Sequence, residues 1–360
     1  MRTWLAFSAV ILLSTPVISA AAELRRFEYE QVEMGVPFRI ALYARDEATA
    51  NKAAAAAYAR IGELNRIMSD YNHESELLRL CKASGPGRPV KVSPELFYVL
   101  CKALELSERS GGAFDVTVGP VVQLWRRARR LRELPDPKRL ADARERVGFE
   151  NMRLDKKART VELLKEKMRL DLGGIAKGYA GDEALRVLKQ HGITRGMIDG
   201  SGDIVVGDPP PGQCGWKIAI EQPPRSSPAA QSSRAAVSNE GRTASSQAEP
   251  VRRFLLLANA AVATSGDAYQ YVEIDGVRYS HIVDPHTGLG LTVPSSVTVV
   301  APNGTAADSL ASAVSVLGPE RGLALIEVTA GAAALVVQFV GNDVSSAESP
   351  RFCCFHFPNE

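Results

Sequence analysis

The spacing of apolar residues changes several times along the first part of the chain. Apolar and polar residues alternate over residues 27–43, which predicts a pair of strands with one buried face. Residues 47–67 are rich in alanine with apolar positions at helical spacing, which predicts an amphipathic helix. Residues 93–107 predict another helix, because Ser93 suits an N-cap and Pro94 the first helical position. Further elements expected before residue 222 are helices at 137–147 and 178–191 and strands at 151–154, 160–163, 196–206 and 216–221.

Residues 222–250 interrupt this pattern. They are rich in Ser, Pro, Ala, Gln and Arg and have no apolar period, so we expect a disordered surface insertion. Residues 341–360 are expected to form a poorly ordered C-terminal appendage. Between these two segments the pattern predicts strands at 254–264, 269–274, 281–283, 296–301 and 333–340 and helices at 305–317 and 319–328.

The order of these elements indicates the fold class. Most predicted strands occur in neighbouring pairs, and the helices lie between the groups of strands. We therefore expect an α+β fold with mixed, largely antiparallel sheets and packed helices, rather than a doubly wound parallel sheet. The predicted domain covers residues 27–340 apart from the insertion.

The composition is that of an ordinary globular protein. Of 360 residues, 45% are hydrophobic and 23% are charged. The 43 basic and 41 acidic residues give a formal net charge of +2, which argues against bulk binding of nucleic acid. We interpret a local basic run at residues 125–132 as a solvated helix face, with a partner site as the alternative.

The N-terminus has the features of a secretory signal peptide. Arg2 precedes an apolar run at residues 4–13, and small residues follow at 19–22. The run is shorter than the roughly 20 residues of a membrane-spanning helix. We expect residues 1–22 to be removed, leaving an exported chain without a transmembrane anchor, in the periplasm or at the outer face of the cytoplasmic membrane. The alternative is an uncleaved anchor. The five cysteines have the spacing of neither a disulfide framework nor a zinc site.

The segment DLGGIAKGYAGD, residues 171–182, carries the first candidate chemistry. Gly173 and Gly174 allow the backbone to approach a ligand closely, and a helix start presents free N–H groups to an anion such as phosphate. Lys177 adds a positive charge. The alternative is an ordinary helix start whose glycines serve the turn, and this segment alone fits both interpretations.

Two earlier segments carry candidate ligand contacts. In MSDYNHESEL, residues 68–77, Tyr71 could stack on a flat ring; the alternative is the end of one helix followed by another capped by Ser75. In GGAFDVTVGP, residues 111–120, Asp115 follows a buried-looking Phe114. A buried carboxylate needs a partner, which is either a ligand or a backbone N–H group.

Two later segments carry candidate acid–base and metal chemistry. His281 lies near Asp284 in SHIVDPHTG and could act as a general base near neutral pH; the alternative is a plain exit from a strand into a turn. Asp308 and Ser312 are four residues apart on one face of a predicted helix. Such a pair suits a hard cation such as Mg²⁺, although an aspartate near a helix start also favours the helix dipole. Ser265 lacks the context of a nucleophile elbow, which argues against a serine hydrolase.

Taken in order, these segments resemble the sequence blocks of the FAD:protein FMN transferase family (ApbE-type). The resemblance spans roughly residues 27–340 apart from the insertion. The matching blocks are Met34-Gly35, MSxYxxxSEL, GxFDxTxGPxxxxW, DLGGIAKGYxxD, TSGD, HIxDPxTG and ADxLxTA.

The resemblance implies an enzyme that binds FAD and Mg²⁺ and cleaves the FAD pyrophosphate. FMN would be attached through a phosphoester to a Thr or Ser of a partner flavoprotein, such as a subunit of a redox complex, and AMP would be released. It further implies that His281 activates the acceptor hydroxyl. The metal would be held by the Gly174 carbonyl, Asp308 and Ser312. The implied FAD site comprises Met34, Tyr71, Ala113, Phe114, Asp115, Asp171, Lys177 and Val283.

Two positions depart from the family pattern. Ser312 stands where the family has a metal-binding threonine, and Ser201 replaces one glycine of a GGDI stretch. Two other activities stay open: a Mg²⁺-dependent FAD pyrophosphatase that uses water as acceptor, and a non-catalytic flavin-binding protein of the envelope. The presence of Lys177, His281 and Asp308 argues against the second.

Overall fold

The largest element of the protein is an eight-stranded sheet in which each neighbouring pair of strands is antiparallel. The computed structural model describes residues 23–221, 252–266, 270–340 and 343–356. The predicted signal peptide and the predicted insertion lie outside these residues. In spatial order the strands are β1 (Arg25–Glu33), β2 (Val36–Ala44), β6 (Gly196–Gly200), β7 (Asp203–Val206), β10 (Ala260–Gly266), β13 (Ser295–Ala301), β14 (Ala333–Val340) and β15 (Asp343–Glu348).

The two faces of this sheet belong to different cores, because side chains alternate along a strand. On β2, Ile40 and Leu42 enter the main core, while Ala41 between them faces a second one. On β14, Val336 belongs to the main core and Leu335 to the second. The alternating pattern in the sequence therefore reflects a sheet that is covered on both sides.

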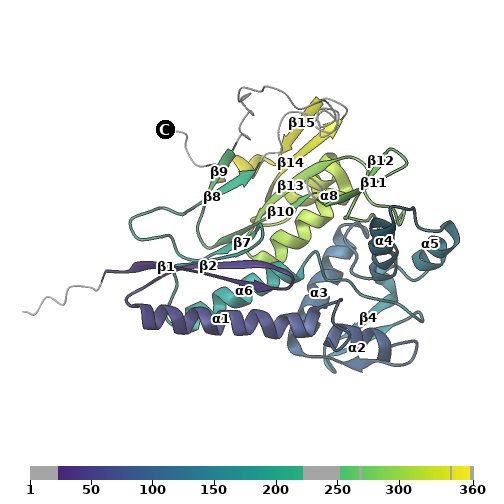
Figure 1. Ribbon diagram of the computed structural model, residues 1–360, viewed down its shortest axis with the longest axis horizontal. Coiled ribbons are helices and arrows are strands. Elements are labelled where there is room, and N and C mark those ends of the chain that lie inside the picture. The colour runs from purple at the N-terminus through teal and green to yellow at the C-terminus, as the bar shows by residue number, and fades with distance from the viewer. Residues whose placement is uncertain (1–22, 222–251, 267–269, 341–342, 357–360) are drawn as a thin grey trace, which may run out of the picture.

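Three long helices cover the main face of the sheet: α1 (Glu47–Met68), α6 (Ala176–Gln190) and α8 (Gly304–Glu327). Figure 1 shows α1 and α6 on one side of the sheet and the small β8–β9 ladder on the other. That ladder, formed by β8 (Trp216–Glu221) and β9 (Arg252–Leu257), covers the second core together with a short 3₁₀ helix, η2 (Pro350–Phe355).

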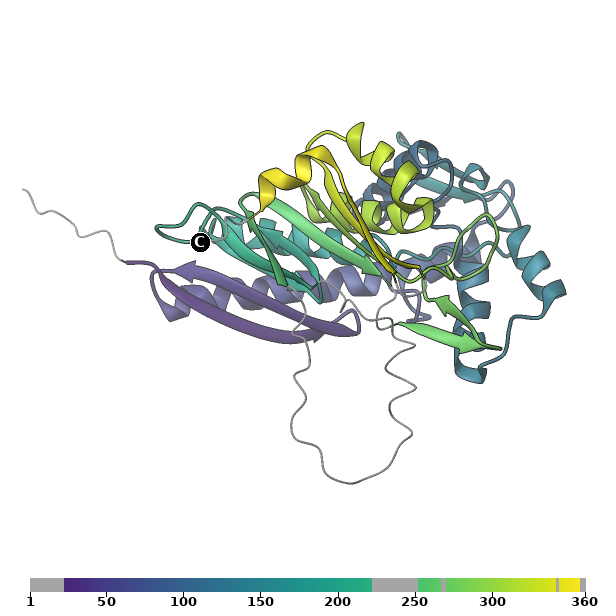
Figure 2. The ribbon, with the colours of Figure 1, turned by 90° about the horizontal axis from the view of Figure 1, so that it is seen from above.

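A smaller group of elements completes the fold next to the long helices. It contains a three-stranded sheet, and a third core in which α4, α5 and a hairpin surround the buried Trp125. Figure 2 shows α4, α5 and the hairpin at one end of the molecule, away from the start of β1. The elements are α2 (Glu76–Ala83), α3 (Pro94–Arg109), α4 (Gly119–Leu131), α5 (Pro137–Arg144), η1 (Phe149–Asn151), the three-stranded sheet β3 (Val90–Lys91), β5 (Thr160–Leu163) and β4 (Met152–Asp155), and the hairpin β11 (Tyr271–Ile274) with β12 (Val277–Ser280).

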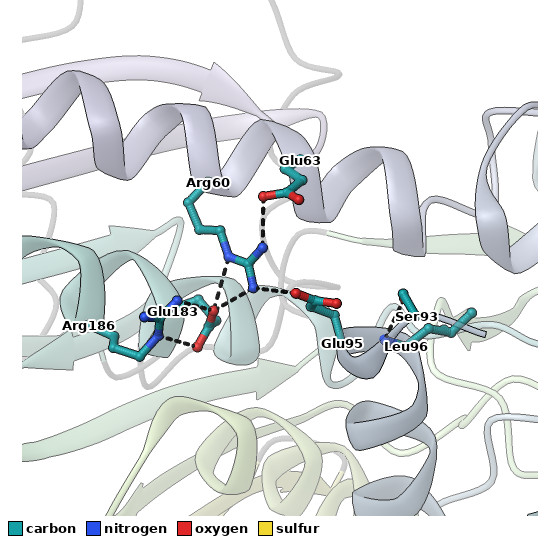
Figure 3. Close-up of polar contacts among 7 residues, drawn as sticks. All are labelled: Arg60, Glu63, Ser93, Glu95, Leu96, Glu183 and Arg186. Atoms are coloured by element: carbon teal, nitrogen blue, oxygen red, sulfur yellow. Dashed lines mark hydrogen bonds and ion pairs between the residues drawn. The ribbon is translucent and has the colours of Figure 1, made fainter. Parts of the chain in front are cut away.

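A partly buried arginine joins three of the helices. Arg60 of α1 forms ion pairs with Glu63 of its own helix, Glu95 of α3 and Glu183 of α6 at 2.7, 2.9 and 2.6 Å (Figure 3). The Arg60 side chain is only 14% exposed, so these contacts are partly protected from solvent. As predicted, Ser93 caps α3 by accepting the N–H of Leu96 at 3.2 Å.

The predicted fold class is confirmed, but five predicted elements differ in detail. The strand predicted at 196–206 is a hairpin of β6 and β7 that turns at Ser201 and Gly202, both with positive φ. The strand predicted at 254–264 divides into β9 and β10 at Asn259, which also has positive φ. The strand predicted at 281–283 is wrong, because the hairpin strand β12 ends before it. The two helices predicted at 305–317 and 319–328 form one kinked element, α8, with Gly318 at φ 74°.

The prediction of a poorly ordered C-terminal appendage is wrong for residues 343–356. β15 pairs with β14 along its whole length, and Phe352 of η2 is fully buried in the second core. The Ser349 hydroxyl accepts the N–H of Ala334 at 2.9 Å, which fastens the junction between β15 and η2. Among the helices of the described residues, none has the length and hydropathy needed to cross a membrane.

Candidate active site

A cavity of about 790 Å³ lies between α4, the start of α6, α8 and the ends of the central strands. Its volume is within the roughly 300–1,000 Å³ usual for small-molecule sites. All but one of the predicted site residues line it, namely Tyr71, Ala113, Phe114, Asp115, Asp171, Gly174, Lys177, His281, Val283, Asp308 and Ser312.

Two glycines bring α6 and α8 into close contact beside this cavity. A Cβ atom on Gly178 would lie 2.0 Å from the Gly304 carbonyl oxygen, and one on Gly304 would lie 2.4 Å from that of Gly178. Asp182 of α6 also accepts the N–H groups of Gly304 and Thr305 at 2.6 and 2.8 Å and so caps α8. The Asp308 carboxylate then reaches the N–H of Gly178 at 3.0 Å, which fixes it at the start of α6.

The first charged group of the cavity consists of Lys177, Asp203 and Asp308, here called the lysine cluster. Lys177 forms an ion pair with Asp203 of β7, whose side chain is only 5% exposed. Burial raises the pKa of Asp308 to about 7, and the charge of Asp203 adds to this effect while Lys177 opposes it. Burial also raises the pKa of Asp203. With both carboxylates ionised the cluster has a net charge of −1, so it favours a further cation.

Two further residues with oxygen donors suited to such a cation, Gly174 and Ser312, line the cavity together with Asp308. A Cβ on Gly174 would lie 2.7 Å from the Ser312 hydroxyl oxygen, so this backbone approach requires glycine. That hydroxyl has no hydrogen-bond partner within the described part of the chain. In the same residues no group of three or more His, Cys, Asp or Glu side chains could hold a metal. A carbonyl, a carboxylate and a hydroxyl are nevertheless the hard donors that Mg²⁺ accepts when phosphate or water completes its shell, so these residues fit the implied ion.

The second charged group consists of Arg126, Asp70 and Asp171, here called the arginine cluster. The Arg126 guanidinium binds Asp70 at 2.5 Å and Asp171 at 3.0 Å. It also lies over the ring of Tyr71, with its central carbon 4.1 Å from the ring centroid. Tyr71 itself is 73% exposed, so one arginine orients a buried carboxylate and an exposed aromatic ring at the same time.

The protonation of Asp171 depends on this arginine. The pKa of Asp171 is raised to about 6, chiefly by burial and also by the charge of Asp70, while Arg126 opposes this rise. The Asp171 carboxylate also accepts the N–H of Gly173 at 2.8 Å. Near neutral pH Asp171 is therefore mainly a carboxylate, held by Arg126 and by the N–H of Gly173.

Asp115 has its partners within its own turn. Its Oδ1 atom accepts the N–H and the hydroxyl of Thr117 at 2.8 and 2.7 Å. Burial raises the pKa of Asp115, whereas these hydrogen bonds lower it. The sequence left two possible partners for Asp115, a ligand or a backbone N–H group, and the structure contains the backbone N–H. Asp115 also lines the cavity next to Phe114 and Ala113.

His281 lies on a loop that follows β12, not on the predicted strand. Its Nδ1 atom is 3.1 Å from the Gln270 carbonyl oxygen. A carbonyl can only accept, so Nδ1 carries the proton and Nε2 is the basic nitrogen of the neutral ring. Trp125 of α4 donates to the Gly288 carbonyl at 2.8 Å and ties this loop to α4.

Met34 is the one predicted site residue that the structure does not bring to the cavity. It lies in the turn between β1 and β2 with φ 52° and packs against the main core. Ser201, by contrast, lines the cavity. Its φ is 58° and its hydroxyl donates to the Pro37 carbonyl at 3.1 Å, so the turn tolerates serine where the family pattern has glycine.

Several charged residues of the cavity were not predicted from the sequence. The basic run was interpreted as a solvated face, which holds for the exposed Arg127 and Arg130 but is wrong for Arg126 and Arg129. The last two are one turn apart on α4 and line the cavity, a spacing that could have indicated a buried side of the helix. Asp203 was quoted only as part of the GGDI-like stretch.

Comparisons with known proteins identify the family of the chain. The sequence matches the ApbE family over residues 34–336. It is 34% identical over 268 residues to the FAD:protein FMN transferase of Vibrio cholerae, covering 74% of this chain and 73% of that protein. It is 31% identical over 313 residues to the protein of the same name from Haemophilus influenzae, covering 84% and 83%. The structure of the flavin transferase ApbE from Vibrio cholerae superposes with a TM-score of 0.77 at 28% identity, covering 92% of this chain and all of that one.

Proposed function

The chain belongs to the ApbE family, and from this premise we propose that it is a Mg²⁺-dependent FAD:protein FMN transferase. FMN would pass from FAD to a Thr or Ser hydroxyl of a partner flavoprotein, with release of AMP. The observation that carries the proposal is the convergence of the lysine cluster, Tyr71, Asp171 and His281 on one cavity of suitable volume.

In the proposed reaction the acceptor oxygen forms a bond to the phosphorus of the FMN half. The bond from that phosphorus to the bridging oxygen breaks, and AMP leaves with the bridging oxygen. The acceptor proton is lost, and Nε2 of His281 is the candidate base for it. Transfer of this kind needs mainly charge neutralisation and in-line positioning, so few groups have to react covalently.

The residues of the cavity divide these tasks. Lys177 would hold the negative pyrophosphate, and its pairing with Asp203 keeps the ammonium group in place. Burial alone would lower the pKa of Lys177, but the charges of Asp203 and Asp308 more than offset this and keep the lysine protonated. Tyr71, held by Arg126, would stack on the flavin ring.

A bound Mg²⁺ would neutralise charge on the phosphates and on the leaving AMP. The Gly174 carbonyl, Asp308 and Ser312 are the residues that would hold it. The raised pKa of Asp308 supports this assignment, because an ionised carboxylate at that position gains from a nearby cation.

The direct test is incubation with FAD, Mg²⁺ and an acceptor domain that carries the target threonine. A flavin-fluorescent acceptor band that survives denaturation is the expected result. Release of free FMN and AMP without a labelled acceptor would favour the pyrophosphatase instead. FAD that stays bound and intact would favour the non-catalytic flavin-binding protein.

We also propose that the protein is exported and acts in the periplasm or at the outer face of the cytoplasmic membrane. The charged start, the apolar run and the small residues of the N-terminus support this. Cell fractionation with N-terminal sequencing tests it, because export predicts a periplasmic chain that begins close to residue 22. A cytoplasmic chain that retains Met1 would contradict it.

A further inference from the structure

A second depression, of about 680 Å³, lies behind α4 on the side away from the cavity. It is bounded by α2, α4, α5 and the segment around Arg169, and is here called the basic groove. Five cationic side chains line it: Lys82, Arg139, Arg146, Lys167 and Arg169.

Four of these five cations have no counter-ion among the described residues. Lys82, Arg139, Arg146 and Lys167 make no ion pair or side-chain hydrogen bond with any described residue. Only two carboxylates, Glu74 and Asp142, line the groove, so five positive and two negative charges leave an excess of +3. The whole chain has a net charge of only +2, so this excess is a local feature and not part of a generally basic surface.

The groove adjoins the proposed active site through two shared walls. Tyr71 lines the cavity and His73, two residues later, lines the groove, a separation of at most about 7 Å along the chain. On α4, Val122 lines the cavity and the next residue, Gln123, lines the groove. A chain that leaves the cavity over Tyr71 therefore reaches the groove within a few residues.

A direct contact also links the two sites. The Arg169 guanidinium donates to the backbone carbonyl of Asp70 at 2.8 Å, and the Asp70 carboxylate binds Arg126. The groove and the arginine cluster thus share one loop.

We propose that the basic groove binds an acidic segment of the acceptor protein that lies close to the hydroxyl receiving FMN. The inference rests on the proposed function. The cations come from three separate parts of the chain, namely α2, α5 with the turn that follows it, and residues 167–169, and several are exposed, which matches carboxylates spread along an extended chain better than one small anion. Among the described residues no Phe, Tyr or Trp side chain lines the groove and His73 is its single aromatic ring, so it lacks the row of stacking side chains typical of sites for single-stranded nucleic acid.

The test reverses three of the exposed charges together in the variant Lys82→Glu/Arg139→Glu/Lys167→Glu. The matched control, Lys52→Glu/Arg66→Glu/Lys157→Glu, changes charge by the same amount at exposed positions outside the groove and the cavity. Transfer from FAD is measured with an acceptor protein and with a short uncharged peptide that carries the same threonine. Thermal unfolding and FAD-binding titrations show whether each variant keeps its fold and its flavin site.

The groove variant is expected to raise KM for the acceptor protein by about tenfold or more, because local charge complementarity speeds encounter. FAD affinity, kcat and transfer to the uncharged peptide should remain those of the control. Added salt should raise KM for the wild type and have little effect on the groove variant.

Three results would overturn the proposal. The groove variant could behave like the control, or it could lose transfer to both acceptors equally. It could also keep transfer and lose only co-sedimentation with vesicles that contain anionic phospholipid, which would make the groove a membrane contact.

A direct measurement of peptide binding distinguishes failure of this inference from failure of the proposed function. If the wild type transfers no FMN, anisotropy of a fluorescein-labelled acidic peptide still measures the groove. Binding that the groove variant alone loses supports the inference, and binding unchanged in that variant contradicts it.

Discussion

The lysine cluster and the arginine cluster have the same composition, one cation and two carboxylates, but their surroundings differ. In the lysine cluster the carboxylates come from β7 and α8, and they are about 5% exposed. In the arginine cluster one guanidinium binds both carboxylates directly, and the neighbouring Tyr71 is open to solvent.

This difference suggests different tasks. A planar guanidinium offers several donors and can satisfy two carboxylates at once, whereas an ammonium group is a point charge. Asp308 forms no ion pair of its own among the described residues and has a raised pKa, so the lysine cluster favours a further cation. In the arginine cluster both carboxylates are already paired with Arg126, which serves to hold an aromatic ring and Asp171.

The largest effect should follow from removing the carboxylate next to the implied metal. Asp308→Asn keeps an oxygen that can accept the Gly178 N–H but loses the charge. We expect transfer to fall by at least about a hundredfold, as for loss of a main electrostatic group. Steady-state transfer assays over a Mg²⁺ titration measure this.

The control for Asp308→Asn is its melting temperature, which should change little because the hydrogen bond to α6 remains. Full activity of a folded Asp308→Asn protein would show that the carboxylate has no role with the metal.

Lys177→Met should weaken FAD binding by about tenfold or more, since it removes the cation proposed for the pyrophosphate. It also leaves Asp203 buried without its ion pair, so we expect the free energy of unfolding to fall as well. Flavin fluorescence titrations and urea unfolding measure the two effects.

The double variant Lys177→Met/Asp203→Asn separates them. Removing both charges should recover most of the lost stability but none of the FAD affinity. Recovery of affinity in the double variant would count against Lys177 as a phosphate ligand.

Arg126→Gln tests the arginine cluster and should have a smaller effect that depends on pH. The raised pKa of Asp171, about 6, means that the folded protein binds a proton more tightly than the unfolded chain. Stability associated with Asp171 is therefore present below its unfolded pKa, near 3.9, and is lost as pH rises through about 6. Arg126 limits that loss because it stabilises the ionised form.

The stability difference between wild type and Arg126→Gln should therefore increase from pH 5 to pH 8, reaching about 2 kcal/mol for a charged hydrogen-bonding group. Urea unfolding at both pH values measures it. Arg127→Gln, at an exposed position on the same helix, is the matched control and should show no such trend. A pH-independent difference would contradict the coupling between Arg126 and Asp171.

The smallest effect is expected at the exposed ring. Tyr71→Phe keeps the stacking surface and should change FAD affinity less than about twofold, whereas Tyr71→Ala should lower it by about fivefold or more. Equal behaviour of the two variants in FAD titrations would remove stacking as the role of Tyr71.

The sequence predicted elements whose signal lies within a few residues. The cap and proline at Ser93 and Pro94 identified α3, and alternation identified β1 and β2. β15 was not predicted, because Val344 and its polar neighbours provide almost no apolar pattern. This segment is a strand because it pairs with β14.

Much of the candidate site was predictable because its blocks have a characteristic order, which brought Asp171, Lys177 and Asp308 to attention. The arginine cluster could not be predicted, because Arg126 and Asp171 are 45 residues apart in the sequence. Only the tertiary fold shows which side of α4 faces the cavity. Met34 was assigned from its block alone, and the β1–β2 turn places it elsewhere.

The proposed function requires that the lysine cluster, and not the arginine cluster, binds a divalent cation. Electron paramagnetic resonance of Mn²⁺ titrated into the wild type, Asp308→Asn and Asp171→Asn, with and without FAD, tests this without depending on turnover. We expect the wild type and Asp171→Asn to bind Mn²⁺ alike and Asp308→Asn to lose the site. Unchanged binding in Asp308→Asn, or loss in Asp171→Asn alone, would contradict it.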